Sequence, residues 1–202
     1  GMNAPYDKPT SLGILPGTVE STVVVKPDPE HVADALNGDD DIGTIICEVS
    51  GANYGSVPLP DGFLPELRRL ADEHNAVLIF DEVITGFRWS PGGRRARDGV
   101  LPDLCSMAKI VTGGMPGGAV GGREEFMRLL DPSVEFRGKT PGVTHKGTFN
   151  GNPLVAASGV AALSEIKTGT PNQLADAAAE RLRTGMREVI EQHQVAGAVY
   201  GE

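Results

Sequence analysis

Short apolar runs recur along the first half of the chain. They cover residues 42–49 (IGTIICEV), 76–80 (AVLIF) and 103–108 (DLCSMA). Runs of this length with little polar alternation are typical of strands that are buried on both faces of a parallel sheet. Residues 19–27 (VESTVVVKP) are rich in β-branched side chains and end with a lysine and a proline, so they predict a further short strand.

Other segments place apolar residues at helical spacing. The clearest is residues 61–75, where the apolar positions are Phe63, Leu64, Leu67, Leu70 and Ala71. Helices are also predicted at residues 28–36, 151–169 and 170–194, and residues 195–202 predict the start of another strand. The order of these elements predicts an α/β fold with a mostly parallel sheet flanked by helices.

Net charge and cysteine content indicate which kinds of binding partner and cellular compartment suit the chain. The chain has 202 residues and a net charge of -9, which argues against nucleic acid and against an anionic membrane surface. No apolar run approaches the roughly 20 residues of a membrane span. Cys47 and Cys105 lie in apolar runs without paired spacing, which indicates reduced thiols and a cytoplasmic protein. The four histidines lack metal-ligand spacing, so no metal site is expected.

Charged residues stand where the predicted strands end. One strand ends at Glu48, the next at the adjacent carboxylates Asp81 and Glu82, and the third leads into Lys109. Ligands of an open parallel sheet bind at the carboxyl ends of its strands, so these side chains are expected to converge. A structural ion pair between Lys109 and one of the acids is one interpretation. Glu82 is better explained by local capping or pairing than by catalysis.

A second interpretation is chemical. Apolar residues flank Lys109 on both sides, so its amine is expected to be partly buried. Burial lowers the pKa of a lysine amine and makes it a nucleophile that forms Schiff bases with carbonyls. Asp81, at the end of a buried strand, would be stable beside a cationic N–H. Pyridoxal phosphate requires a lysine for its aldehyde and an acid for its ring nitrogen, so it matches this pair.

Three motifs occur in order and extend this interpretation: LIFDEVITGFRWSPGG, PDLCSMAKIVTGGMPGGAVGGREEFM and KGTFNGNPLVAASGVAAL. Together they resemble the class III aminotransferases of fold type I, and most closely the glutamate-1-semialdehyde 2,1-aminomutase branch. The resemblance implies the large-domain fold of the fold type I transferases. It also implies transfer of an amino group, as an aminotransferase or an aminomutase, on an amino/keto or amino-aldehyde acid.

The resemblance also implies roles for individual residues. Lys109 would form the Schiff base and move the proton between carbons, and Asp81 would pair with the pyridine nitrogen. Val83 would pack on the cofactor ring, although an ordinary core position is an equal alternative. Thr148 would bind the phosphate of a cofactor that is held mainly by the neighbouring subunit of a dimer, and Gly147 before it would also belong to the cofactor site. Glu48 and Asn53 would lie near cofactor and substrate. A cap for the following helix is the alternative interpretation of Thr148.

The family pattern implies a division of the chain. Residues 1–165 would form part of the large domain, and residues 166–202 a helix and the start of a small C-terminal domain. The family's N-terminal segment, which cups the phosphate, is expected to be missing here, as is the rest of the small domain. A second chain supplying the phosphate-binding segment is one possible partner, beside a homodimer or larger assembly and small amino and keto substrates.

Two alternatives to an active enzyme stay open. The first is a catalytically silent relative of the aminotransferases that acts through association or needs a second chain. The second is an unrelated α/β binding domain, which three matching motifs in order disfavour.

Overall fold

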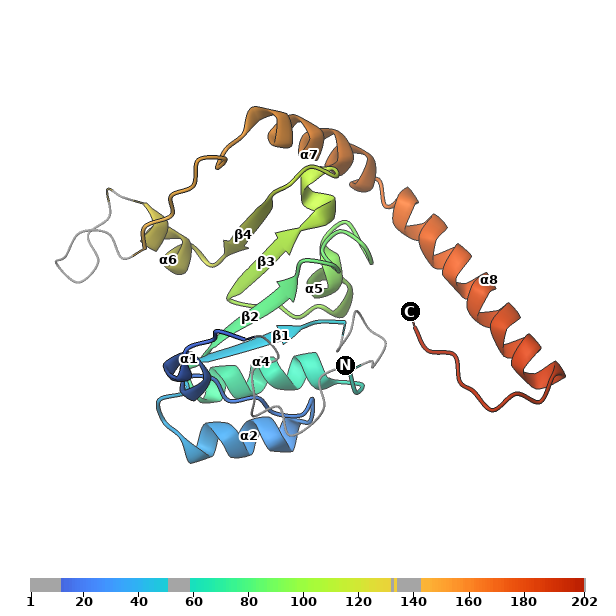
Figure 1. Ribbon diagram of the computed structural model, residues 1–202, viewed down its shortest axis with the longest axis horizontal. Coiled ribbons are helices and arrows are strands. Elements are labelled where there is room, and N and C mark those ends of the chain that lie inside the picture. Colours follow the sequence, from blue (N-terminus) through green and yellow to red (C-terminus); the bar gives the residue numbers. More distant parts are fainter. Residues whose placement is uncertain (1–11, 51–58, 132, 134–142, 202) are drawn as a thin grey trace.

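The computed structural model of the chain describes residues 12–50, 59–131, 133 and 143–201. The helices are α1 (Pro16–Glu20), α2 (Pro29–Gly38), α4 (Phe63–Glu73), α5 (Gly93–Asp98), α6 (Glu124–Met127), α7 (Pro153–Ile166) and α8 (Thr170–Gln192), with short 3-10 helices η1 (Lys109–Thr112) and η2 (Arg128–Leu130). The strands are β1 (Thr44–Glu48), β2 (Val77–Glu82), β3 (Leu104–Ala108) and β4 (Gly118–Gly122). They form a sheet in the order β1-β2-β3-β4 (Figure 1).

The sheet is mostly parallel, as predicted. β1, β2 and β3 run parallel, and β4 pairs antiparallel with β3. The register aligns Glu48 with Asp81 and Asp81 with Ser106. Residues in register on neighbouring strands point to the same face, so these three form one polar row at the carboxyl edge of the parallel strands. Alternation along β2 sends Phe80 and Glu82 to the opposite face.

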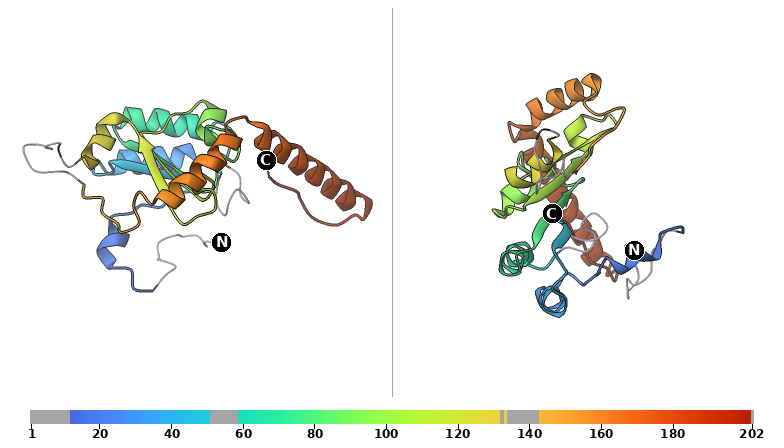
Figure 2. Two further views of the ribbon diagram at one scale, coloured as in Figure 1. Left: turned by 90° about the horizontal axis from the view of Figure 1, so that it is seen from above. Right: turned by 90° about the vertical axis from the view of Figure 1, so that its left-hand side faces the viewer.

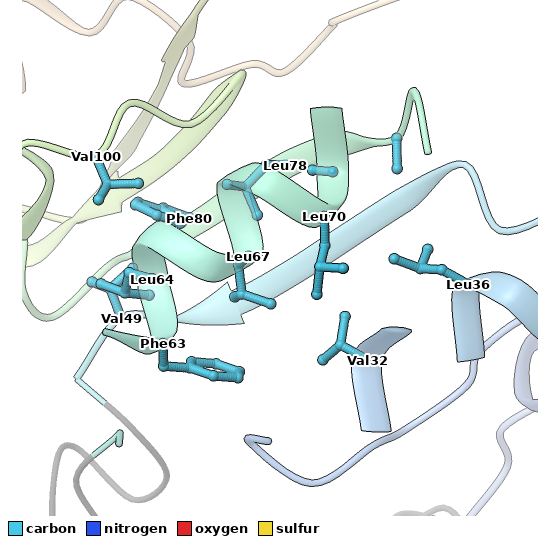
Figure 3. Close-up of a cluster of buried hydrophobic side chains, with 12 residues drawn as sticks. Val32, Leu36, Val49, Phe63, Leu64, Leu67, Leu70, Leu78, Phe80 and Val100 are labelled. Carbon is cyan, nitrogen blue, oxygen red and sulfur yellow. The ribbon is translucent and has the colours of Figure 1, made fainter. Parts of the chain in front are cut away.

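The main core lies on that opposite face. α4 buries its apolar stripe there, and Leu67, Leu70, Leu78 and Phe80 are each at most 2% exposed (Figure 3). α2 packs beside α4 and contributes further apolar side chains to the same cluster. Full burial of one such side chain stabilises a fold by about 1.5–3 kcal/mol. This cluster therefore fixes the helix against the strand that carries Asp81.

The other face of the sheet is open at both edges. Ile46 on β1 is 69% exposed and Val120 on β4 is 54% exposed. The prediction that residues 42–49 are buried on both faces is therefore wrong. β1 is buried on one face only, because α2 and α4 both pack on the same face of the sheet (Figure 2).

Three other elements differ from the sequence predictions. Residues 22–26 and 195–201 pair with no strand in the described part of the chain, although both were expected to be extended strands. β-branched residues stabilise a strand only beside a partner strand, so their pattern alone does not create one. Conversely, β4 was not predicted, because four of its five residues in the run GAVGG are glycine or alanine. A side chain at Gly122 would meet the Asp103 carbonyl oxygen at 2.2 Å, so the close pairing requires glycine there.

The two long C-terminal helices are confirmed. Asn152 caps the N-terminus of α7, and its side-chain oxygen accepts the N–H of Leu154 at 2.9 Å. α8 projects away from the sheet (Figure 2). Its first turn is fixed by Asn172, which is 7% exposed and donates its side-chain N–H groups to the carbonyl oxygens of Phe87, at 2.9 Å, and Arg88. None of the described helices is both long and apolar enough to cross a membrane.

Candidate active site

Asp81 is the penultimate residue of β2, and one of its carboxylate oxygens is already engaged. Oδ1 accepts the backbone N–H of Val83 at 3.0 Å and the hydroxyl of Ser106 at 3.0 Å. Among the described residues, no donor reaches Oδ2. The carboxylate is thus held in one orientation by one donor from the following turn and one from the adjacent strand, and its second oxygen is left for another cation or N–H.

Lys109 follows β3 directly and has an unusual backbone. Its φ is +52°, in the left-handed region that costs a non-glycine residue about 1–3 kcal/mol. Its side chain is exposed, so the expectation of a partly buried amine is wrong. The reason is that the chain leaves the sheet at Ala108 and turns into η1. Within the described part of the chain, Lys109 forms no ion pair, so a structural ion pair with an acid is also not seen.

An open pocket of about 780 Å³ lies beside Lys109. Its lining includes Lys109, residues 113–117 of the glycine-rich loop, and Ala162 of α7. Asp81 does not line this pocket. The described residues therefore bring Asp81, on β2, and Lys109, directly after the adjacent strand β3, to the same edge of the sheet without enclosing both in the pocket beside Lys109.

Glu82 has a local structural role, as predicted. It is 1% exposed, and its carboxylate accepts the N–H of Arg94 at 2.8 Å and the hydroxyl of Thr85 at 3.2 Å. A side chain at Gly93 would meet Glu82 Oε2 at 2.4 Å, so glycine is required for this approach. Burial raises the pKa of the neighbouring Cys105 thiol to about 11, and the Glu82 carboxylate adds to the shift. Glu82 thus anchors the turn that follows Asp81.

Glu48 occupies the end of β1 in the same row as Asp81. Its Oε1 accepts the Ser50 hydroxyl at 3.1 Å. Burial raises the pKa of the adjacent Cys47 thiol to about 12, and the Glu48 carboxylate adds to this shift. Both cysteines are free thiols. Asn53, expected near cofactor and substrate, lies outside the described residues.

The segment before α7 holds the other two predicted residues. Gly147 and Thr148 are exposed, and Thr148 makes no side-chain hydrogen bond to any described residue. The helix cap is Asn152, so the alternative that Thr148 caps α7 is wrong. No side-chain hydrogen bond or ion pair joins these two residues to Asp81 or Lys109 within the described chain. Val83 is partly buried, and its N–H orients Asp81.

Sequence reasoning missed Ser106 and Asp103. Ser106 lies 25 residues from Asp81, and only the strand register brings them together. Asp103 is buried at the opposite edge of the sheet, where its Oδ2 accepts the Leu78 N–H at 2.7 Å and Arg68 at 2.9 Å. Burial alone would raise the pKa of this carboxyl, but hydrogen bonds from Leu78, Arg123 and Arg68 outweigh it and lower the pKa. No group of three or more potential metal ligands occurs in the ranges that the structure describes.

Solved structures share the fold of this chain. An omega-transaminase from Sphaerobacter thermophilus superimposes with a TM-score of 0.83 and 34% identity, covering 96% of this chain and 43% of that protein. A transaminase with PLP bound gives 0.83 at 32% identity, over 95% of this chain and 44% of that one. A glutamate-1-semialdehyde-aminomutase from Pseudomonas aeruginosa PAO1 in complex with PMP gives 0.73 at 27% identity, over 91% and 42%. The predicted fold type I architecture is confirmed.

Sequence relatives agree. The glutamate-1-semialdehyde 2,1-aminomutase of Ignicoccus hospitalis is 43% identical over 194 residues, which are 95% of this chain and 43% of that protein. The enzyme of the same name from Nitratidesulfovibrio vulgaris is 48% identical over 160 residues, 76% of this chain and 36% of that protein. This chain thus spans less than half the length of these relatives. Residues 23–202 match the sequence profile of the class-III aminotransferases, an enzyme family that uses pyridoxal phosphate, and the chain belongs to that family.

Proposed function

We propose that the chain forms part of a pyridoxal phosphate-dependent enzyme that transfers an amino group, as an aminotransferase or an aminomutase acting on an amino/keto or amino-aldehyde acid. The observation that carries the proposal is the placement of Asp81 and Lys109. Asp81 lies at the carboxyl end of β2, and Lys109 directly follows the adjacent parallel strand β3 at the same edge of the sheet. Ligands of such sheets bind at this edge.

The residues present fit the cofactor. Asp81 keeps Oδ2 open while Val83 and Ser106 fix Oδ1, which suits a carboxylate that receives one N–H from a ring nitrogen. The Lys109 amine is exposed and unpaired within the described residues, so it is accessible for covalent attachment to an aldehyde carbon. When bound, the cofactor supplies an electron sink for the substrate carbanion.

Each proposed residue would help to hold the cofactor or to move a proton. Lys109 would hold the cofactor covalently, and its Nζ would carry a proton between carbon atoms. Asp81 would keep the ring nitrogen protonated, and Val83 would pack on the ring. Gly147 and Thr148 bind the phosphate of a cofactor held mainly by the neighbouring subunit. Glu48 and Asn53 lie near cofactor and substrate.

The proposal extends to domain organisation and assembly. Residues 1–165 form the large-domain portion, and residues 166–202 form a helix and the start of a smaller domain; the projection of α8 from the sheet supports this division (Figure 2). The protein forms a homodimer or larger assembly, in which a further segment or a second chain contributes phosphate donors. Exposed apolar side chains of the segment 149–160 support association: Phe149 82%, Leu154 62% and Val160 66%. The free thiols support a cytoplasmic location.

A second candidate function is association without catalysis. The same exposed apolar side chains favour it, because they form a surface suited to a protein partner whether or not Lys109 reacts. Light scattering separates the assembly question from the chemical one. A monomer at high protein concentration would contradict both the proposed dimer and this alternative.

The chemical test is covalent trapping. The protein is mixed with pyridoxal phosphate, reduced with borohydride and digested, and the modified peptide is identified by mass spectrometry. We expect a phosphopyridoxyl group on Lys109, and its loss in Lys109→Ala. Lys167→Ala is the matched control, because Lys167 is also exposed but lies at the end of α7. Equal labelling of both lysines, or none, would refute the proposed role of Lys109.

A further inference from the structure

The turn that carries Lys109 is packed against α7 through two glycines. A side chain on Gly113, at the end of η1, would meet the Ser158 carbonyl oxygen at 2.4 Å. A side chain on Gly159 would meet the Val111 carbonyl oxygen at 2.6 Å. Real Cβ atoms do not approach this closely, so each glycine is needed for the backbones to touch. Gly159 is also the one buried residue among the described positions of α7.

Hydrogen bonds close the same contact. The Ser158 hydroxyl donates to the Gly113 carbonyl oxygen at 2.9 Å, across 45 residues of sequence. Inside the turn, Thr112 Oγ1 lies 3.0 Å from the carbonyl oxygen of Lys109 itself. Thr112 is 5% exposed, so this hydroxyl is shielded from water. Figure 1 shows α7 lying over the end of β3, where η1 begins.

A turn of this kind needs support. Lys109 has a φ of +52° and Gly113 one of +61°, so the backbone enters and leaves η1 in the left-handed region. A lysine does not favour that region by itself, and such residues persist when their surroundings fix them. Among the described elements outside the sheet, α7 makes the most extensive contact with η1.

We propose that Ser158 and Gly159 of α7 are positioning residues that hold Lys109 in its left-handed conformation and so direct its amine. The inference that this conformation serves a cofactor rests on the proposed function. The inference that α7 maintains the turn does not.

The first test is amide hydrogen exchange without cofactor. The N–H of Gly113 donates to Ile110 at 3.0 Å and that of Met115 to Thr112 at 3.3 Å, so their exchange reports opening of the turn. Gly159→Ala should accelerate exchange in the peptide 109–117 by about tenfold, with β2 unchanged. Gly185→Ala is the matched control, because Gly185 is also helical and a side chain there meets nothing within 4 Å. Equal exchange in the two variants would overturn the proposal.

Ser158→Ala is the milder variant if Gly159→Ala does not fold. It removes the hydrogen bond to Gly113 and adds no atom, so we expect about threefold faster exchange in the same peptide. Ser164→Ala is its control, because Ser164 is exposed on α7 and makes no side-chain hydrogen bond to a described residue. Indistinguishable exchange in Ser158→Ala and Ser164→Ala would remove Ser158 from the proposal.

The second test measures cofactor binding by absorbance. Gly159→Ala should weaken pyridoxal phosphate binding about tenfold relative to Gly185→Ala, at a temperature where both variants are fully folded. Faster exchange with unchanged binding would overturn positioning of the amine. If the unmodified protein binds no pyridoxal phosphate, the proposed function fails, and the exchange test alone decides whether α7 maintains the turn.

Discussion

The two faces of the sheet differ in what covers them and in what they carry. On the face packed by α4, Leu78 and Phe80 have no measurable exposure. On the opposite face, Ile46 is 69% exposed, and the row formed by Glu48, Asp81 and Ser106 remains partly accessible. Burial of apolar surface stabilises the first face, whereas the second leaves polar groups open to a ligand. Stability and proposed chemistry are therefore separated across the thickness of one sheet.

The largest expected loss of stability comes from a substitution on the face that α4 covers. Phe80→Ala should lower the free energy of unfolding by about 3–5 kcal/mol, because it removes a fully buried ring and leaves a cavity. Ile46→Ala, on the open face, should change it by only about 0.5 kcal/mol. Urea denaturation measures both. Similar losses in the two variants would contradict the one-sided core.

Asp81 and Glu82 are adjacent carboxylates on opposite faces of the sheet, so substituting each one tests the difference between the two faces. Glu82→Ala should cost about 2–3 kcal/mol of unfolding free energy, because it removes the acceptor of the buried Thr85 hydroxyl and of the partly buried Arg94 N–H. Asp81→Ala should cost about 1 kcal/mol, since its carboxylate is only partly buried and accepts two hydrogen bonds. Covalent trapping of pyridoxal phosphate should show the reverse order, with the larger loss in Asp81→Ala. The same order in both measurements would argue against separate roles.

Asp103 lies at the edge of the sheet opposite the candidate site, and its hydrogen bonds predict how stability depends on pH. Its pKa is lower in the folded protein, so its hydrogen bonds with Leu78, Arg123 and Arg68 stabilise the fold above the ordinary carboxyl pKa of about 3.9. That contribution is lost as the pH falls through the folded-state pKa. Asp103→Asn should cost about 2 kcal/mol at pH 7 and flatten the stability profile below pH 4. Asp61→Asn, at an exposed position, is the control, and an unchanged profile in Asp103→Asn would refute the assignment.

The smallest expected effect concerns Ser106. Ser106→Ala removes one hydrogen bond to Asp81 and should cost about 0.5–1.5 kcal/mol of unfolding free energy. Ser106→Thr keeps the hydroxyl and should restore most of the loss. Thermal unfolding of the two variants measures the difference. A threonine variant as unstable as the alanine variant would show that packing, not the hydrogen bond, accounts for the effect.

Much of this fold could be predicted because local pattern determines it. The stripe of α4 and the run of β2 are each encoded within a dozen residues, so their positions were predicted correctly. The charged strand ends of Asp81 and Lys109 were likewise visible in sequence. Residues 22–26 were mispredicted, because a strand depends on a partner that the local pattern does not contain.

The site was less predictable, since it depends on long-range register and backbone conformation. The bond between Ser106 and Asp81 joins residues 25 positions apart. The exposure of Lys109 follows from its left-handed backbone, which its apolar neighbours in sequence do not reveal. The approach of α7 to η1 was also hidden, although the glycines at 113 and 159 carry a signal: they are needed where two backbones touch.

The anchoring of α8 by Asn172 has a mechanical consequence. Its side-chain amide donates hydrogen bonds to the carbonyl oxygens of Phe87 and Arg88, six and seven residues after Asp81 in the chain. α8 has 23 residues and is therefore a rigid arm about 34 Å long, with its pivot at Asn172. A rotation of about 10° at the pivot moves the far end by about 6 Å. A partner bound at the far end of α8 would therefore exert a large torque on the turn after β2, to which Asn172 ties the first turn of the helix.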